Sequence, residues 1–138
     1  MTELDQLISA AYASQGKQED VNKVYITLLR SLLFLPVKKD KSPEDEEPFR
    51  PLFATIDDHY FMLTFDTLER LTEWAGDQLT NIDYVEISGR DLITGINDDV
   101  FLVLNAGFEF FKEFSPDEIK QLKKVVLRID QLKGDAAN

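Results

Sequence analysis

The chain has 138 residues and a formal net charge of −11, from 15 Lys and Arg against 26 Asp and Glu. It contains no Cys and a single His, which excludes disulfides, thiolate nucleophiles and any metal site that needs Cys or two imidazoles of one chain. The length predicts one globular domain over residues 1–138, and the strong acidity argues against partners such as nucleic acid or an anionic membrane surface.

The first part of the chain predicts two helices and a strand. Apolar residues recur at helical spacing over residues 4–12 and again over 21–32. Thr2 and Asp5 are spaced as a capping box at the start of the first helix. The next run, 32–37, is short and apolar and contains a proline, which favours a buried strand over a continued helix.

A charged segment, 38–50, separates this part of the chain from the next elements. It is rich in Lys, Asp, Glu and Pro and cannot bury apolar area, so we expect a mobile surface loop. Its acidic run is a candidate recognition segment for a basic partner, and a solvated loop is the alternative interpretation. The run consists of Glu44, Asp45, Glu46 and Glu47.

Residues 52–65 predict a β-hairpin. Residues 52–56 form its first strand, Asp57 and Asp58 turn the chain, and residues 59–65 form the second strand. Because the second strand has apolar residues on both faces, we expect it to be central in a sheet and covered on both sides.

Helices and strands alternate after the hairpin. Asp66 is predicted to cap a helix that ends at Gly76. A strand is expected at 84–87, and Ser88 then predicts the cap of a short helix that ends near Gly95.

The C-terminal third predicts a buried strand at 100–104, a turn at 105–107 and a short edge strand around 109–112. Residues 115–118 read Ser-Pro-Asp-Glu, a strong start signal for a helix that we expect to end near Gly134. The apolar residues expected to face inward from this helix are Ile119, Leu122, Val126 and Ile129.

Taken together, these elements predict an α/β (α+β) fold. Helices bracket the strands and a hairpin lies between them, which is typical of a layered domain. We expect a single domain with a mixed β-sheet of about five or six strands flanked by helices.

Three segments resemble the N-terminal domain of the SseB (enhanced serine sensitivity) family. They are residues 60–69 leading to Trp74, residues 88–93, and residues 101–107 before the helix that starts at Ser115. The resemblance implies the same α/β fold and a bacterial accessory role, and it implies no reaction, because the family has no established catalytic mechanism. The N-terminus lacks the features of a secretory signal, so we expect a cytoplasmic location.

A group of phenylalanines near the C-terminal third is the candidate partner-binding surface. Phe108, Phe110 and Phe111 lie next to the expected edge strand, where an exposed aromatic patch is typical of protein interfaces, and core packing is the alternative. With the acidity of the chain, they predict a non-enzymatic protein-interaction module with a basic protein partner. Homo-oligomerisation through residues 108–114 is a second hypothesis.

No residue is predicted to be catalytic or to bind a cofactor or metal, although the sequence leaves open whether the protein is an enzyme. The glycines form no phosphate-binding motif, and the carboxylate pairs lack the spacing of a calcium loop. The alternative function is an enzyme or small-ligand-binding protein with a site at a sheet edge. That site would combine His59, Asp91 and Asn105 with Asp57 and Ser88.

Overall fold

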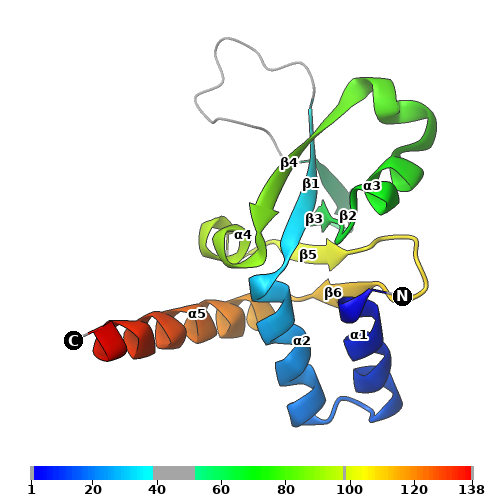
Figure 1. Cartoon of the computed structure of the whole chain (residues 1–138). Helices are drawn as coiled ribbons and strands as arrows, with labels where there is room; N and C mark the ends of the chain where they lie inside the picture. The colour runs from blue at the N-terminus through cyan, green and yellow to red at the C-terminus, as the bar shows by residue number, and fades with distance from the viewer. Residues whose placement is uncertain (1, 39–51, 98, 138) are drawn as a thin grey trace.

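The computed structural model describes residues 2–38, 52–97 and 99–137 (Figure 1). All but the first residue of the predicted loop at 38–50 lies outside the described residues, and so does the acidic run at 44–47.

An antiparallel pair of helices opens the fold. α1 spans Glu3–Ala13 and α2 spans Gln18–Arg30. The predicted capping box is present: the Thr2 side chain accepts a hydrogen bond from the Asp5 amide at 3.2 Å, and an Asp5 carboxylate oxygen accepts one from the Thr2 amide at 3.1 Å. The two helices pack against each other through buried apolar residues, which include Leu4, Ile8, Val24 and Leu28.

Six strands in the described residues form two sheets. β1 (Leu32–Lys38) and β4 (Ile82–Ser88) pair antiparallel in a two-stranded sheet. The second sheet has the order β2-β3-β5-β6, in which only β3 and β5 run parallel. The bounds of its strands are Phe53–Ile56, His59–Thr64, Phe101–Leu104 and Lys112–Phe114.

The α+β class and the strand count agree with the sequence-based prediction, but the strands divide between two sheets instead of forming one. The sheets are joined where Phe34 of β1 and Phe65, directly after β3, exchange two backbone hydrogen bonds of 2.8 and 3.0 Å. This is the one β-bridge between the two sheets among the described residues, and the Leu52 amide, directly before β2, also donates to the Pro36 carbonyl of β1 at 3.0 Å.

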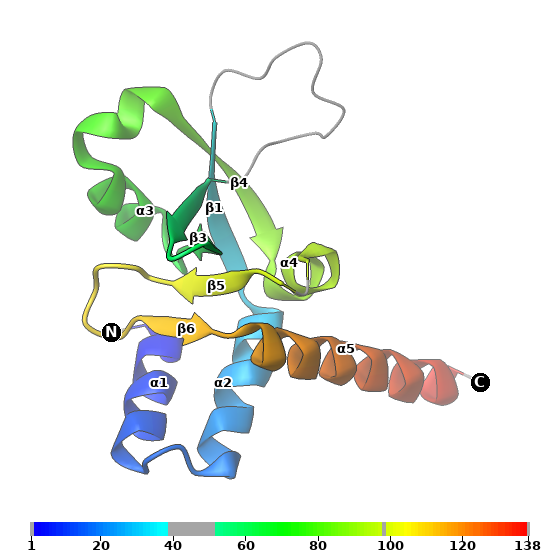
Figure 2. The same cartoon turned by 180° about the vertical axis from the view of Figure 1, so that it is seen from behind.

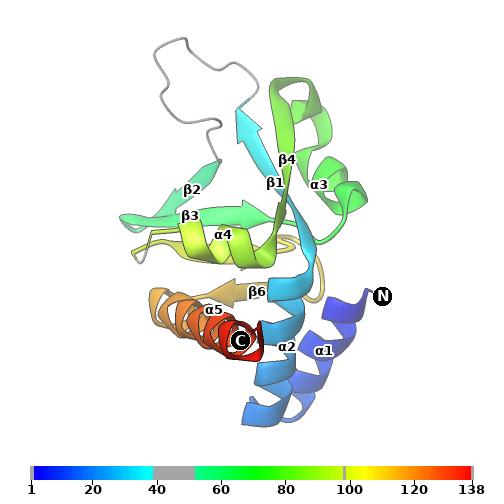
Figure 3. The ribbon, with the colours of Figure 1, turned by 60° about the vertical axis from the view of Figure 1, so that its left-hand side comes forward.

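The remaining helices lie between and after the strands. α3 (Leu68–Ala75) leads into the 3₁₀ helix η1 (Gly76–Asn81), and α4 (Gly89–Gly95) follows β4. The long helix α5 (Pro116–Ala137) ends the chain and projects beyond α2 and α4 (Figures 1 and 3).

One hydrophobic core lies between the four-stranded sheet, the two-stranded sheet and the helices α1, α2, α4 and α5. Its fully buried side chains come from every one of these elements, so no part of this core belongs to a separate unit. The largest of them are Ile8, Leu28, Leu33, Leu35, Ile93, Leu102, Leu104, Phe114, Ile119 and Leu122.

Two element boundaries differ from their predictions. The last edge strand begins at Lys112, not near residue 109, because Asn105 adopts a left-handed conformation and its carbonyl accepts from the Phe108 amide at 3.1 Å, which keeps this segment in a turn. The last helix continues through Gly134 to Ala137. An interior Gly costs a helix only about 1 kcal/mol, so it weakens this helix without ending it.

The cap of α3 is also different from its prediction. Thr67, not Asp66, is the N-cap, and its side chain accepts from the Arg70 amide at 3.1 Å. Asp66 is unavailable as a cap because its carboxylate is bound by Arg70 and by the Thr2 hydroxyl.

Candidate functional site: an open aromatic sheet face

The two faces of the four-stranded sheet differ in what covers them. Side chains alternate between the faces along each strand. On one face Met62, Thr64, Leu102 and Leu104 are buried, and the apolar members of this set belong to the core. The opposite face, here called the open face, carries Ala54, Ile56, His59, Phe61, Leu63, Phe101, Val103 and Glu113.

Aromatic rings occupy the centre of the open face. The Phe61 and Phe101 rings stack with their centroids 4.8 Å apart, and His59 meets Phe101 edge-on at 5.5 Å. Both phenylalanines are half-buried, and neither packs against the core. Figure 2 shows β5 and β6 with no helix drawn in front of them.

β3 is therefore central, as predicted, but within the described residues it is covered on one face only. The described helices do not provide the expected cover on both sides, because apolar residues on two faces of a strand do not reveal whether enough helices are present to cover both. In this chain α2, α4 and α5 all contribute to the core on the same side.

Acidic groups surround the open face. Strands β2, β3 and β5 contain no Lys or Arg. The Asp57–Asp58 turn, Asp99 and Glu113 are exposed around it. Lys112 of β6 lies on the opposite side of the sheet, where its ammonium group is 3.0 Å from a Glu118 carboxylate oxygen and 5.0 Å from the Phe114 ring centroid.

Only one of the three phenylalanines predicted to bind a partner is exposed. The Phe108 ring lies against the Arg70 guanidinium, with 5.5 Å between the ring centroid and Arg70 Cζ, and Phe110 packs on the core. Phe111 is 46% exposed, and its carbonyl accepts a hydrogen bond from the Tyr12 hydroxyl at 3.0 Å. Sequence reasoning missed Phe61 and Phe101, although the apolar residues on both faces of β3 were a signal for them.

Next to Phe111 lies a small apolar groove between α1, α2 and β6. Its volume is about 180 Å³, well below the roughly 300–1,000 Å³ of pockets that hold drug-sized ligands. Burial, together with a 2.9 Å hydrogen bond to Glu118, raises the pKa of Tyr25 far above its ordinary value, so this hydroxyl stays neutral. The lining residues are Ile8, Ala11, Tyr12, Gln15, Gly16, Val21, Val24, Tyr25 and Lys112. The groove fits one apolar side chain.

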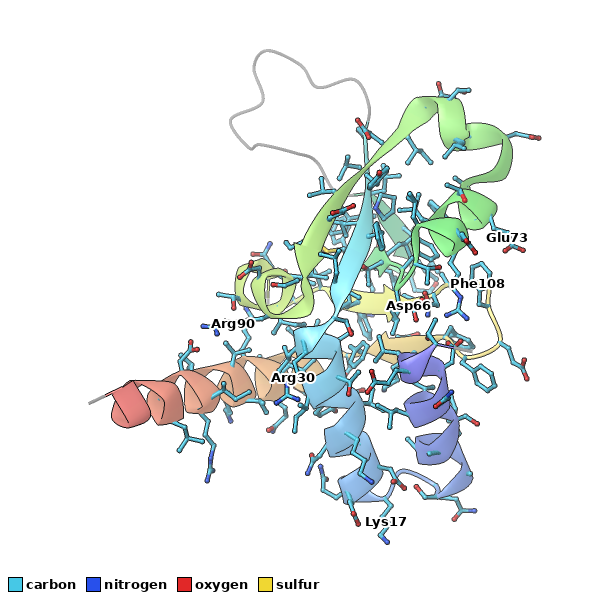
Figure 4. The ribbon with its side chains drawn as sticks, viewed as in Figure 1. Lys17, Arg30, Asp66, Glu73, Arg90 and Phe108 are labelled. Carbon is cyan, nitrogen blue, oxygen red and sulfur yellow. The ribbon has the colours of Figure 1, made fainter. Side chains whose placement is uncertain are left out.

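A buried ion-pair network ties α1 to α3. Arg70 donates from Nη1 to Asp5 Oδ1 at 2.8 Å and to Asp66 Oδ1 at 3.0 Å, and from Nη2 to Asp5 Oδ2. The Thr2 hydroxyl donates to Asp66 Oδ2 at 2.6 Å. Figure 4 shows Asp66 and Phe108 in this region, between α3 and the start of α1. Every carboxylate of the network has a partner, and the network holds α1 against the start of α3.

Asn105, directly after β5, lies next to the ion-pair network. It is fully buried with φ +58°, and its side-chain oxygen accepts from the Asp66 amide at 3.1 Å. Its Nδ2 has no hydrogen-bond partner among the described residues. Asn tolerates the left-handed conformation better than most residues, and this explains its place at the turn.

The Asp5 carboxylate makes stability depend on pH. Its hydrogen bonds to Arg70 hold the pKa of Asp5 below its ordinary value. In acid, the unfolded chain therefore binds more protons than the folded chain. We expect the free energy of unfolding to fall as the pH drops below about 4, the ordinary pKa of an aspartate, and to keep falling until the pH has passed the lowered pKa of Asp5 in the folded protein. Urea unfolding curves recorded from pH 7 to 3 measure this slope.

The control for this prediction is Asp77→Asn, which removes an exposed carboxylate of η1. Asp5→Asn should lose stability at pH 7 and show a shallower acid slope than the wild type, while Asp77→Asn keeps the wild-type slope. An unchanged slope in Asp5→Asn would contradict the assignment.

The residues of the alternative small-ligand site are not brought together. His59 begins β3 and Asn105 follows β5, and because these strands are parallel the two residues lie at opposite ends of the sheet, about 20 Å apart at the usual rise of a strand. Ser88 and Asp91 form the cap of α4, where the Asp91 amide donates to Ser88 Oγ at 3.1 Å. The geometry therefore does not favour this alternative.

No group of three or more described His, Asp or Glu side chains is arranged to hold a metal ion. None of the described helices is both long and apolar enough to cross a membrane.

The fold and the open face define an α+β domain in which helices cover a four-stranded sheet on one side. The chain belongs to the SseB family: the family model described as the SseB protein N-terminal domain matches residues 4–121. The match includes all six described strands and the open face, and it ends within α5. No curated protein and no solved structure matches the chain.

Proposed function

We propose that this chain is a non-enzymatic protein-interaction domain of the bacterial cytoplasm and that its open face binds a basic segment of a protein partner. The observation that carries the proposal is the stacked Phe61 and Phe101 pair at the centre of a sheet face that no described helix covers. Exposed apolar patches bordered by polar residues are typical of protein-binding surfaces.

The chemistry of the face supports a protein partner of this kind. Aromatic side chains dominate binding energy at interfaces, because they bury a large area with little loss of side-chain entropy. The acidic groups around the face attract cationic side chains and repel acidic segments. A segment that combines apolar with Lys or Arg side chains therefore complements both the centre and the rim.

Catalysis is poorly supported by the same surface. Its titratable groups are His59 and Glu113, and they lie on β3 and β6, two strands apart. Two strand spacings are about 10 Å, and because Glu113 is level with Leu63, the two residues are also about 13 Å apart along the strands. This exceeds hydrogen-bond reach between a base and a nucleophile.

The proposal is tested by selecting short random peptides that bind the purified protein from a displayed library. We expect the selected peptides to be enriched in Lys or Arg together with Leu, Phe or Met. Their affinity should fall about tenfold or more for Phe101→Ser, since truncating a central aromatic residue of an interface typically costs at least that much.

The matched control is Tyr12→Ser, which removes an exposed aromatic side chain at the groove between α1 and α2. Circular dichroism melting checks that both variants are folded. Peptides that lose affinity for Tyr12→Ser but not for Phe101→Ser would place binding at the groove and overturn the proposal, as would peptides without a cationic bias.

A further inference from the structure

We infer that the partner of the open face is a second copy of this chain, which docks the outer side of its α5 helix there. The inference rests on the proposed function, and it adds the identity of the partner. α5 combines exposed apolar and cationic side chains, which complement the aromatic centre and the acidic rim of the open face.

The outer side of α5 carries two exposed leucines among polar residues. Leu127 and Leu132 are 63% and 61% exposed, which is high for large apolar side chains. Between them lie Lys124, Arg128 and Gln131, and together these five residues line a shallow surface hollow. The buried side of the helix is formed instead by Ile119, Leu122 and Val126.

This side of α5 is also cationic. Lys120, Lys124 and Arg128 follow one another at four-residue spacing on the same side of the helix, and all three are exposed. None of them forms an ion pair with another described residue. The nearby carboxylate of Asp130 forms an ion pair with Arg90 of α4, which is labelled in Figure 4. Asp130 therefore does not neutralise these three cationic side chains.

The two surfaces match in size and in charge. Residues 120–132 of a helix extend about 18 Å, and the six residues of β3 extend about 20 Å. The leucines can cover Phe61 and Phe101, while the cationic groups meet the Asp57–Asp58 turn, Asp99 and Glu113. Such pairing between oppositely charged surfaces sets orientation and speeds association.

A chain cannot make this contact with itself. α5 packs through Ile119 and Leu122 into the core, which lies on the opposite face of the sheet from Phe61 and Phe101. Its projecting half points away from the body of the molecule (Figure 1). The contact is therefore between copies.

Sedimentation of three forms of the full chain tests the inference. The face variant is Phe61→Ser/Phe101→Ser, and the helix variant is Lys124→Glu/Arg128→Glu. We expect the wild type to sediment above the 15.9 kDa of one chain in a concentration-dependent way, and each variant alone to sediment as a monomer. An equal mixture should form a species of two chains, because it pairs one intact helix with one intact face.

A second face variant covers the case in which the first fails to fold. Asp57→Asn/Asp58→Asn/Glu113→Gln keeps the apolar face, and Asn suits the positive φ of 50° and 66° at the turn. It should associate more weakly than the wild type and with less dependence on salt, because its rim charges are gone.

The failures of the two proposals are distinguishable. A wild type that stays monomeric at every concentration overturns the inference, and peptides that still need Phe101 would leave the proposed function standing. A mixture of the two variants that stays monomeric while the wild type associates also overturns the inference, because association then uses other surfaces. Selected peptides that dissociate the wild-type oligomer support both proposals.

Discussion

Gly89→Ala is expected to lower the free energy of unfolding by at least about 4 kcal/mol, in the range that only severe structural defects reach. A Cβ atom at Gly89 would lie 1.8 Å from the Leu28 carbonyl oxygen and 2.7 Å from its carbonyl carbon. Both are backbone atoms of α2, so no side-chain rotation relieves the contact. The helix α4 would have to move away from α2, and this would open the core around Leu28 and Ile93.

Thermal and urea unfolding of the variant measure this effect. The matched control is Gly95→Ala in the same helix, where an added Cβ meets nothing within 4 Å. This control should change the free energy of unfolding by no more than about 1 kcal/mol. Any change should be an increase, because Ala has a higher helix propensity than Gly. Equal effects at the two positions would show that α4 does not lie against α2 as closely as the structure has it.

Arg70→Met is expected to destabilise the protein by about 3–5 kcal/mol, the usual cost of removing one partner of a buried ion pair. The Asp5 side chain is 1% exposed and that of Asp66 is 5% exposed. Without the guanidinium, two buried carboxylates lose their counter-charge, and α1 loses its link to α3. Urea unfolding at pH 7 measures the loss.

Arg90→Met is the control for loss of an arginine. Arg90 pairs with Asp130 at a site where the two side chains are 42% and 39% exposed, and exposed pairs contribute about 0–1 kcal/mol.

Arg70→Met should also recover part of its stability as pH falls toward 4, because protonation neutralises the buried carboxylates. A loss no larger than that of Arg90→Met, with no recovery in acid, would contradict the role given to the network.

The sequence alone predicted the features that depend on neighbouring residues. The capping box at Thr2 and Asp5, the cap at Ser88, the Asp57–Asp58 turn and the helix start at Ser115 all appear in the structure, where each cap is closed by hydrogen bonds of 3.1 to 3.3 Å. These features use contacts three residues apart, which local spacing reveals directly. The same local patterns supported the α+β class and the resemblance to the SseB family, which its family model confirms.

Only the tertiary structure decided which surfaces are free. Asp66 was predicted to cap α3, but it binds Thr2, 64 residues away, and no local pattern contains that contact. Phe108, a candidate for an exposed patch with core packing as the alternative, packs against Arg70 and Phe65, whereas Phe61 and Phe101 stack on the uncovered side of the sheet. Alternation along β3 shows that two faces exist, but the number and placement of the helices decide which face is covered, because burial is a property of the whole packed chain.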